Sequence, residues 1–206
     1  MTRTVGSHGP TTSLAIRKAG LRLITEHGFE AMSLRQLAAE VGLQTASLYN
    51  HIKTKQHLLF ELIHEHLTAL LEQTDAALAQ VAGESPTRRL ERFVLHHLTY
   101  HMEKKREVFV ANFELRGLSP ENYKVIVALR RRYEARLIAI LDEGVAAGMF
   151  DLLDTQVAAY AILAMLTGAC TWYRPDGRLS TDDVVMLHTK MLLNGCLHLA
   201  GGNTPS

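Results

Sequence analysis

The chain has 206 residues, of which 47% are hydrophobic and 21% charged, and a formal net charge of +1. This composition is typical of a globular protein with one or two domains and excludes a low-complexity chain. Charged residues or histidines interrupt each apolar run before it reaches membrane-spanning length, and no apolar signal segment is found at the N-terminus, so we expect a cytoplasmic protein.

The first predicted elements belong to a small N-terminal head. Residues 1–12 are rich in Gly, Ser, Thr and Pro without periodicity, which predicts a flexible arm. An apolar stripe predicts a first helix over 13–27, and Gly28 is a natural stop for it. Phe29 is expected to fill the core of this head.

Residues 33–52 have the pattern of a helix, a sharp turn and a second helix, which is the layout of a DNA-reading helix-turn-helix. Ser33 can cap the first of these helices, and Gly42 falls at the turn, where a positive φ favours glycine. Leu48 and Ile52 restart the apolar face. The outward positions carry short hydrogen-bonding side chains and a tyrosine, which suit base edges and phosphates. They are Gln44, Thr45, Ser47, Tyr49 and Asn50.

Charge is distributed unevenly along the chain. Residues 1–55 carry seven basic and three acidic side chains, a net charge of +4, and the remainder therefore carries −3. A basic head on a mildly acidic body fits a nucleic-acid-binding module joined to a second functional part.

The remainder of the chain reads as a helical body. Helices are predicted over about 55–81, 86–104, 108–115, 120–147, 155–173 and 181–199, with Ser or Asp caps and Pro in several first turns. No segment shows convincing strand alternation, so the fold class is all-α with about nine helices. The expected domains are a DNA-binding head over 13–54, a ligand-binding and dimerisation body over 55–200, and a tail over 201–206.

The eighth predicted helix is apolar around its whole circumference from Val157 to Cys170. Such a helix must be covered on all sides, whereas a surface helix in a chain of this size has only one side against its own core. The ninth predicted helix is also apolar, and two such helices from each of two chains would form a four-helix interface. The alternative is that both helices are central in one chain. The predicted interface residues are Ile162, Met165, Leu166, Ala169, Leu187 and Met191.

A basic three-helix head followed by a helical body resembles the TetR family of transcriptional repressors. The resemblance is specific over about 13–60 and fits the remainder in length and helix number. The matching residues are Gly28-Phe29, Ser33 to Ala38, Val41-Gly42, Ser47 to Ile52, and Lys53-Thr54-Lys55 before Leu58-Leu59. The resemblance implies a homodimer that binds a near-palindromic operator in double-stranded DNA and is released when a small-molecule effector binds its body.

Roles for individual head residues also follow from this resemblance. Phosphate contacts are implied for Ser33 and Tyr49, and a clamp on the DNA backbone for Lys55. Positions on or beside the recognition helix are implied for Gln44, Thr45, Ser47 and Asn50, and backbone contacts near its end for His51 and Lys53. Arg35 completes the predicted DNA-binding set.

The body has a weaker resemblance, to TetR-family regulators of fatty-acid or sterol catabolism, which respond to acyl-CoA thioesters. The matching segments are Phe113 to Ser119, Arg132-Tyr133-Glu134, 144–150 and Trp172 to Ser180. An acyl-CoA effector is therefore implied, with a free apolar compound sensed by a regulator of efflux or detoxification genes as the alternative. The predicted ligand-binding residues are Arg136, Arg132, Trp172, Phe113, His97, His101 and Tyr133.

Arg136 is the predicted anchor for an anionic ligand, because it falls inside the apolar stripe of its helix, where an arginine must find an anion. That anion is either a ligand phosphate or carboxylate or an internal carboxylate such as Glu114 or Glu91. Trp172 either lines a pocket and stacks on the ligand or belongs to the core or an interface.

Other signals argue against catalysis. His97 and His101 lie four residues apart beside His96, but no Cys-x-x-Cys or His-Glu-x-x-His frame accompanies them, so neither a metal nor another cofactor is predicted. No Ser-His-Asp or Cys-His arrangement can be read, and we expect a regulator instead of an enzyme. Two alternatives are a helical enzyme with a fortuitous head motif and an architectural DNA-binding protein with a filled body and no effector.

Overall fold

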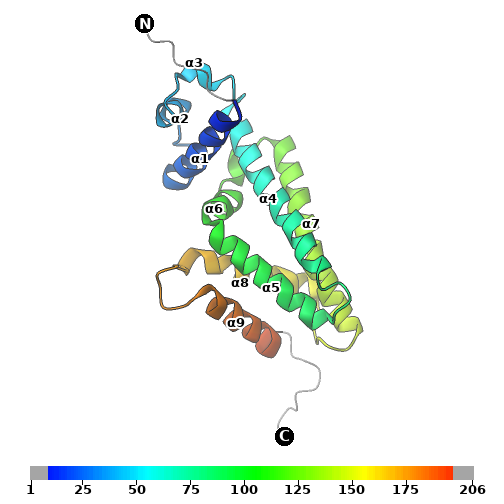
Figure 1. Ribbon diagram of the computed structural model, residues 1–206. Helices are drawn as coiled ribbons and strands as arrows, with labels where there is room; N and C mark the ends of the chain where they lie inside the picture. The colour runs from blue at the N-terminus through cyan, green and yellow to red at the C-terminus, as the bar shows by residue number, and fades with distance from the viewer. Residues whose placement is uncertain (1–8, 197–206) are drawn as a thin grey trace. The chain divides into compact units, whose positions relative to one another are not determined.

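The structure is a computed structural model that describes residues 9–196, and within them every regular element is helical (Figure 1). The predicted all-α fold with nine α-helices is confirmed for this part of the chain. The elements are α1 (Gly9–His27), α2 (Leu34–Glu40), α3 (Thr45–Leu48), α4 (Lys55–Ala79), α5 (Pro86–Glu103), α6 (Lys105–Phe113), the 3₁₀ turn η1 (Leu115–Gly117), α7 (Pro120–Ala146), α8 (Thr155–Trp172), α9 (Thr181–Met191) and the π-helical turn η2 (Leu192–Cys196).

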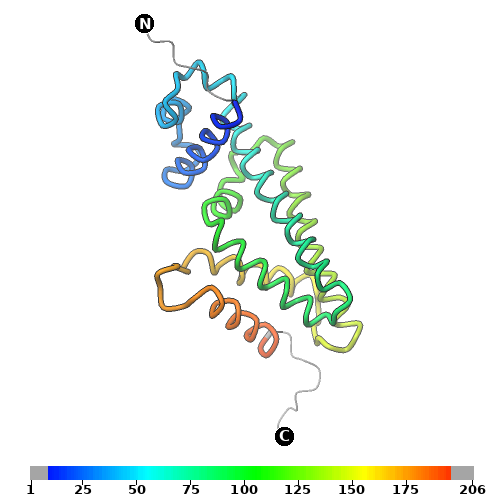
Figure 2. The backbone as a smooth tube through the Cα atoms, viewed as in Figure 1, coloured from blue at the N-terminus to red at the C-terminus, as the bar shows by residue number. Residues whose placement is uncertain are grey.

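Two compact units make up the described chain. Unit 1 contains residues up to 67 together with 106–127, and unit 2 contains 68–105 together with the residues from 128 onward. The residues of α4 and of α7 are each divided between the two units, and the chain trace draws each as one continuous helix (Figure 2). This division differs from the predicted boundary between 54 and 55, because the start of α4 and a distant segment both pack into the unit that holds the head.

The N-terminal boundary also differs from the prediction. The helix α1 begins at Gly9, so residues 9–12, which were expected to belong to a flexible arm, are helical. The first eight residues of the predicted arm, the predicted tail over 201–206 and the last residues of the predicted ninth helix lie outside the described residues.

The helix-turn-helix forms through the local signals in its sequence. The Ser33 hydroxyl accepts from the Gln36 backbone N–H at 3.2 Å, and the Gln36 side chain accepts in return from the Ser33 backbone, which completes a capping box. Gly28 and Gly42 have φ angles of 82° and 68°, the left-handed region that favours glycine. The regular part of α3 is shorter than predicted, and turns continue it as far as Ile52, whose N–H donates to the Leu48 carbonyl.

In unit 2, α5 has most of its circumference buried. It packs against α8 and α9, and its buried residues include two histidines and a tyrosine among apolar side chains. The buried face of α8 recurs at helical spacing, and Val184 and His188 form the buried face of α9. The remaining faces of α8 and α9 are exposed in the single chain.

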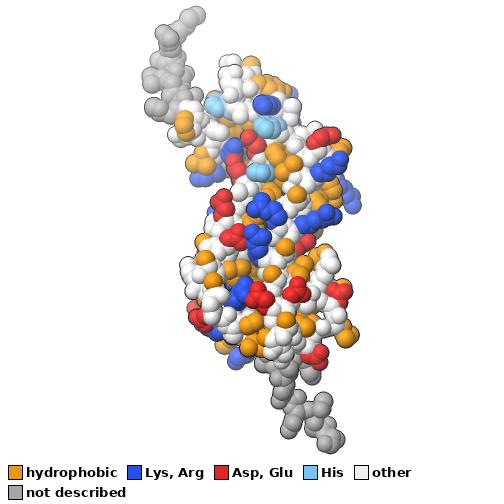
Figure 3. Space-filling view, turned by 90° about the vertical axis from the view of Figure 1, so that its right-hand side faces the viewer, with side chains coloured by type: hydrophobic (Ala, Val, Ile, Leu, Met, Phe, Trp, Pro, Cys, Tyr) orange, Lys and Arg blue, Asp and Glu red, His pale blue; other side chains and the backbone are white. Residues whose placement is uncertain are grey.

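Among the described residues no helix is long and apolar enough to cross a membrane. On the face drawn in Figure 3, acidic and basic side chains are interspersed with hydrophobic ones.

Candidate DNA-binding face and effector site

All ten predicted DNA-binding residues lie in unit 1, on α2 and α3, on the caps and turns beside these helices, and at the first residue of α4. Leu48 and Ile52 are buried beneath this surface, with 0% and 4% of their area exposed, and fix its position. The side chain of Tyr49 is 55% exposed. Arg35, Gln44, Asn50 and Lys53 are also exposed, whereas Ser33, Thr45, Ser47, His51 and Lys55 are half-buried.

The basic residues of unit 1 divide into two groups. Arg17 pairs with carboxylates of α4, and Arg22 pairs with Glu26 at 2.9 Å and with Glu40. The hydrogen bond that Arg22 donates to the Glu40 carboxylate is the main cause that raises the pKa of Arg22. Within residues 9–196 no ion pair engages Arg35 or Lys53. These two cations therefore remain available to DNA phosphates.

Ser33 and Lys55, two residues predicted to contact the DNA backbone, already take part in interactions within the protein. The Ser33 hydroxyl takes part in the capping box and donates to Gln36 Oε1 at 2.9 Å. Lys55 Nζ donates to the Glu30 carbonyl at 3.0 Å and lies 4.5 Å from the centroid of the Phe29 ring. The ammonium group of Lys55 thus stabilises the turn between α1 and α2, and its clamp on the DNA backbone stays a prediction.

The structure brings three of the predicted ligand residues together inside unit 2. His97 Nδ1 lies 2.7 Å from the hydroxyl of Tyr133, and the rings of His97 and His101 stack with centroids 3.8 Å apart. His101 Nδ1 donates to the His97 carbonyl at 2.8 Å. His97 Nε2 lies 3.2 Å from Thr167 Oγ1 on α8. These contacts join α5 to α7 and α8.

Proton positions in this network follow from counting donors. The only hydroxyl proton of Thr74, on α4, is donated to the Leu70 carbonyl at 2.7 Å, so Thr74 can only accept from its hydrogen-bonded partner Tyr133. Tyr133 then accepts from His97 Nδ1–H, and His97 Nε2 accepts from Thr167. Both ring nitrogens of His97 are used internally, so a ligand that binds His97 has to displace Tyr133 or Thr167.

Burial keeps these groups neutral. Desolvation lowers the pKa of His97 well below its ordinary value of 6.5 and lowers that of His101 to about 4. Desolvation also raises the pKa of Tyr133 far above its ordinary value of 10.0. The network is therefore an uncharged hydrogen-bonded strut at neutral pH.

The predicted anionic-ligand anchor has an internal partner. Arg136 Nε and Nη2 donate to the two carboxylate oxygens of Asp75 at 2.8 Å and 3.0 Å, a bidentate pair between α7 and α4. The hydrogen bond with Arg136 is the main cause that lowers the pKa of Asp75. Of the two alternatives for Arg136, the structure shows the internal carboxylate, although the partner is Asp75 and neither Glu114 nor Glu91. Sequence periodicity missed Asp75, because that residue lies 61 positions away on an exposed helix face.

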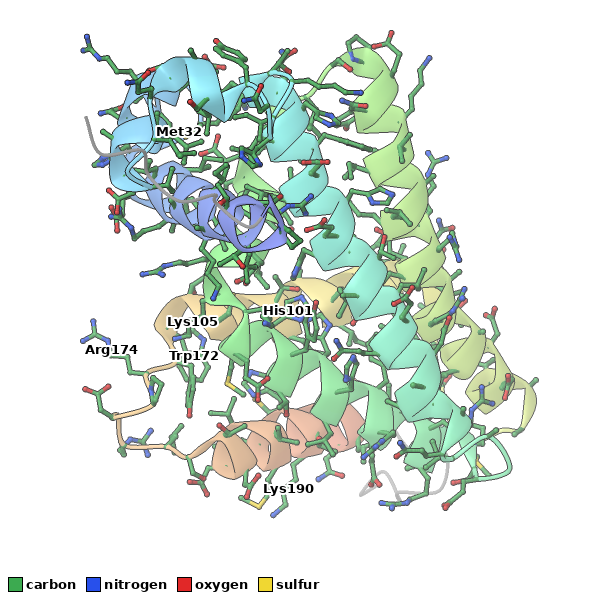
Figure 4. All side chains as sticks on the ribbon, turned by 45° about the horizontal axis from the view of Figure 1, so that its top comes forward. Met32, His101, Lys105, Trp172, Arg174 and Lys190 are labelled. Carbon is green, nitrogen blue, oxygen red and sulfur yellow. The ribbon has the colours of Figure 1, made fainter. Side chains whose placement is uncertain are left out.

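The other predicted ligand residues are dispersed. Arg132 is exposed on α7, and its carbonyl accepts from Arg136. Phe113 is 64% exposed at the end of α6, in unit 1. Trp172 is 51% exposed at the end of α8, and its ring stacks on His188 with centroids 6.1 Å apart. Figure 4 shows Trp172 beside Lys105. The Nζ of Lys105 donates to the carbonyl of Tyr173, the residue that follows Trp172.

Half of the predicted interface residues lie inside the protomer. Ile162, Leu166 and Ala169 are buried within unit 2, with at most 3% of their area exposed, so they leave little area for a partner subunit to cover. They form the face of α8 that packs on the chain's own core. Met165 is half-buried, whereas Leu187 and Met191 are 41% and 49% exposed.

Sequence reasoning overlooked the exposed side of α8. It carries Val157 and Tyr160, which are 63% and 46% exposed, and the exposed small residues Ala161 and Ala164. The signal was present, because 157, 160, 161 and 164 recur at helical spacing on the side of α8 opposite its buried residues.

No group of three or more potential metal-ligating side chains occurs among the described residues. The imidazoles of His97 and His101 are instead engaged with each other and with uncharged oxygen atoms.

Comparisons with known proteins agree with this arrangement. Residues 16–62 match the family model described as bacterial regulatory proteins, tetR family, and residues 83–196 match the model described as tetracyclin repressor-like, C-terminal domain. The second match alone covers more than half of the chain. The family and the relatives found are transcriptional regulators, so the enzyme interpretation has no support.

Individual relatives extend over nearly the whole chain. The repressor KstR2 of Mycolicibacterium smegmatis is 25% identical over 181 residues, 87% of each protein. The crystal structure of the regulator PfmR from Thermus thermophilus is 36% identical, with a TM-score of 0.78, and covers 87% of this chain and 97% of that one. The structure of AibR in complex with isovaleryl coenzyme A and operator DNA is 26% identical, with a TM-score of 0.81, and covers 88% of this chain and 98% of that one.

Substitutions of Lys53 and of Tyr49 should distinguish a charged contact to a DNA phosphate from an uncharged one. Both Lys53→Ala and Tyr49→Ala should weaken binding to specific and unrelated duplexes alike, because phosphate contacts carry no sequence information. Only Lys53→Ala should reduce the slope of log affinity against log salt concentration, by about 0.9 for each bound head. Fluorescence anisotropy at several salt concentrations measures both effects, with Lys104→Ala in unit 2 as control. A loss restricted to one DNA sequence would contradict the assignment.

The free energy of unfolding should fall in acid, because the buried histidines of unit 2 stay neutral in the folded chain but take up protons in the unfolded chain. In the unfolded chain His101 titrates near 6.5, whereas its folded pKa is about 4, so stability present above pH 6.5 is lost as pH falls toward 4. This group alone accounts for about 3 kcal/mol at the lower limit, and His97 acts in the same direction. Urea unfolding between pH 7.5 and 4.5 measures the loss. His101→Gln should flatten the dependence and exposed His27→Gln should not; equal slopes in all three proteins would contradict neutral burial.

Proposed function

Because the chain belongs to the TetR family of bacterial regulatory proteins, we propose that it is a transcriptional repressor that binds a near-palindromic operator as a homodimer and is released by an acyl-CoA thioester. The observation that carries the proposal is the exposed polar and basic surface on a correctly capped helix-turn-helix. Binding to chromosomal DNA places its action in the cytoplasm.

The outward side chains of the head support DNA recognition. Exposed Gln44 and Asn50 can hydrogen-bond to base edges, and Asn and Gln suit adenine. Arg35, Lys53 and Tyr49 supply contacts to phosphates on either side. Two such heads related by a twofold axis would read two half-sites of an operator whose symmetry matches that of the protein.

The exposed apolar side of α8 and α9 supports a homodimer. Val157 and Tyr160 on α8, with Leu187 and Met191 on α9, present apolar area that a single chain leaves in water. A twofold interface joins the same surface of both subunits, so two helices from each chain bury it in a four-helix arrangement.

The proposal of an acyl-CoA effector rests on relatives and on one surface of unit 2. AibR has been crystallised with isovaleryl coenzyme A, and KstR2 is a repressor that aligns over most of the chain. The half-exposed indole of Trp172 provides a flat face for an adenine ring, and Lys105 and exposed Arg174 provide cations for phosphates nearby (Figure 4).

The bidentate pair between Arg136 and Asp75 favours a second candidate, an effector without a phosphate. Arg136 was the only cation of the predicted set inside an apolar stripe, and Asp75 already neutralises it. His97, His101 and Tyr133, in the core of unit 2, are uncharged at neutral pH. A free apolar compound sensed by a regulator of efflux or detoxification genes would suit such a core.

A ligand series decides between the two effector classes. Isovaleryl-CoA and longer acyl-CoAs should raise the melting temperature, since a ligand at a hundred times its Kd stabilises by about 2.7 kcal/mol. They should quench the fluorescence of Trp172, the single tryptophan, and release operator DNA. Trp172→Leu should weaken acyl-CoA binding roughly two- to tenfold, and exposed Tyr123→Leu should leave it unchanged. A response to free acids or apolar drugs alone would support the second candidate, and no response to any compound the architectural alternative.

Glutamate placed on the exposed apolar face should separate the subunits. The double variant Leu187→Glu and Met191→Glu introduces like charges that face each other across a twofold axis, and this repulsion should yield monomers with weakened operator binding. Light scattering coupled to size-exclusion chromatography measures the mass. The matched control is Val125→Glu on α7, which alters an equally exposed apolar residue of unit 1. Dimers of unchanged affinity in the double variant would place the interface elsewhere.

A further inference from the structure

Residues 44–50, the recognition segment of the head, carry no charged side chain. Their sequence is Gln-Thr-Ala-Ser-Leu-Tyr-Asn, and they form the N-cap of α3, the helix itself and the start of the turn that follows. The nearest charged residues along the chain are Glu40 and Lys53, and Glu40 pairs with Arg22 within the protein. Any base contact that this segment makes is therefore made by an uncharged group.

Two amide side chains of the recognition segment are available to a ligand. Gln44 is exposed at the N-cap of α3, and its side chain makes no capping hydrogen bond. Asn50 is exposed in the turn after α3, where its backbone N–H donates to the Ser47 carbonyl at 3.2 Å. In the part of the chain that the structure describes, neither side-chain amide has a hydrogen-bond partner within the protein. Each amide therefore keeps both a donor and an acceptor for a base edge.

Adenine is the base whose major-groove edge matches an amide. It presents the N6 amino donor beside the N7 acceptor, so one amide side chain can donate to N7 and accept from N6 at the same time. Guanine presents two acceptors, N7 and O6, which arginine or lysine binds with two donors. Cytosine presents a donor that a carboxylate accepts. The recognition segment contains neither a cation nor a carboxylate, so its amides favour adenine.

Methyl groups lie beside the two amides. Ala46 is exposed and stands four residues before Asn50, and half-buried Thr45 directly follows Gln44. Positions four apart share one side of a helix, and turns continue α3 beyond Asn50. Thymine presents its C5-methyl group in the major groove, where the methyl groups of alanine and threonine contact it. An amide next to a methyl group thus matches an adenine next to a thymine.

We infer that the recognition segment reads A·T base pairs, with the amides of Gln44 and Asn50 bound to adenine edges and the methyl groups of Thr45 and Ala46 in contact with thymine. The inference rests on the proposed function, because it requires the segment to lie in the major groove of an operator. It deepens that function by naming the bases in each half-site. A G·C pair at the same position leaves an amide group unpaired in the interface, which is costly.

Selection of duplexes from a random DNA library supplies the operator and the first test. The wild type should select half-sites with A·T pairs at the positions that face the segment. Gln44→Ala and Asn50→Ala should each lose the preference at a different one of these positions and retain the others, because a base contact acts locally. Both variants should keep the wild-type melting temperature, since each truncates an exposed side chain. The matched control is Gln73→Ala, which removes an exposed amide on α4 in unit 2 and should retain every preference.

Modified bases in the selected duplex test single contacts and leave the protein unaltered. 7-Deaza-adenine still pairs with thymine but lacks N7, so at the adenine assigned to Gln44 it should weaken wild-type binding roughly five- to 150-fold. It should weaken binding of Gln44→Ala less than about twofold, because that variant has no amide to lose. Uracil at the thymine assigned to Thr45 removes a methyl group and should weaken wild-type binding about fourfold, and binding of Thr45→Ser much less. Competition fluorescence anisotropy measures these ratios.

The outcomes separate this inference from the proposed function. A selected operator in which Gln44→Ala or Asn50→Ala alters the preference at a G·C pair would overturn the inference. Equal effects of 7-deaza-adenine on the wild type and on the matching alanine variant would do the same. An operator sequence unchanged in both alanine variants would show that bases are read from outside the recognition segment, which also overturns it. If the wild type selects no duplex at all, the proposed function itself is rejected, and the inference falls with it.

Discussion

The hydrogen-bonded histidines of α5 impose the main constraint on unit 2. A buried imidazole without a partner is costly, so His97 fixes the positions of Tyr133 on α7 and of Thr167 on α8 through its two nitrogens. His101 stacks on it and donates back to the α5 backbone, which leaves both rings in fixed orientations. The hydrogen bonds of His97 therefore fix one alignment of α5, α7 and α8 against each other, in addition to the apolar contacts of the core. A fully satisfied buried network specifies a unique packing more sharply than apolar contacts alone.

Different kinds of contact hold the helices of the two units in place. In unit 1, buried aromatic and aliphatic groups hold a surface of polar side chains whose own contacts within the protein are few. In unit 2, the ion pair of Arg136 with Asp75 and the neutral strut hold α4, α5, α7 and α8 together. The helix α6, most of which belongs to unit 1, follows α5 after a single residue.

Local signals in the sequence predicted most of the fold, and long-range pairing accounts for what they missed. The sequence predicts the helix cap at Ser33 and the positive φ angle at Gly42, because both depend on neighbouring residues only, whereas the return bond from the Ser33 backbone to the Gln36 side chain appears only in the structure. The partner of Arg136 was not, since no periodicity links α7 to a carboxylate on α4. Apolar composition showed that α8 has two faces to cover, but it could not tell which face the chain covers itself. The structure resolves this point: Ile162 faces inward and Val157 outward.

The exposed residues of the helix-turn-helix can be replaced in evolution more freely than the buried residues beneath them. Gln44 and Asn50 project from a surface whose position is fixed by other residues, so their replacement removes little buried area. Exposed positions of this kind change folding free energy by about 0.5 kcal/mol or less. Replacement of these two residues therefore leaves the fold intact, whereas a side chain larger than glycine at position 117 would overlap the Phe29 ring. Under the proposed function, the residues that recognise bases are free to vary between descendants of this chain, whereas the residues packed beneath them are not.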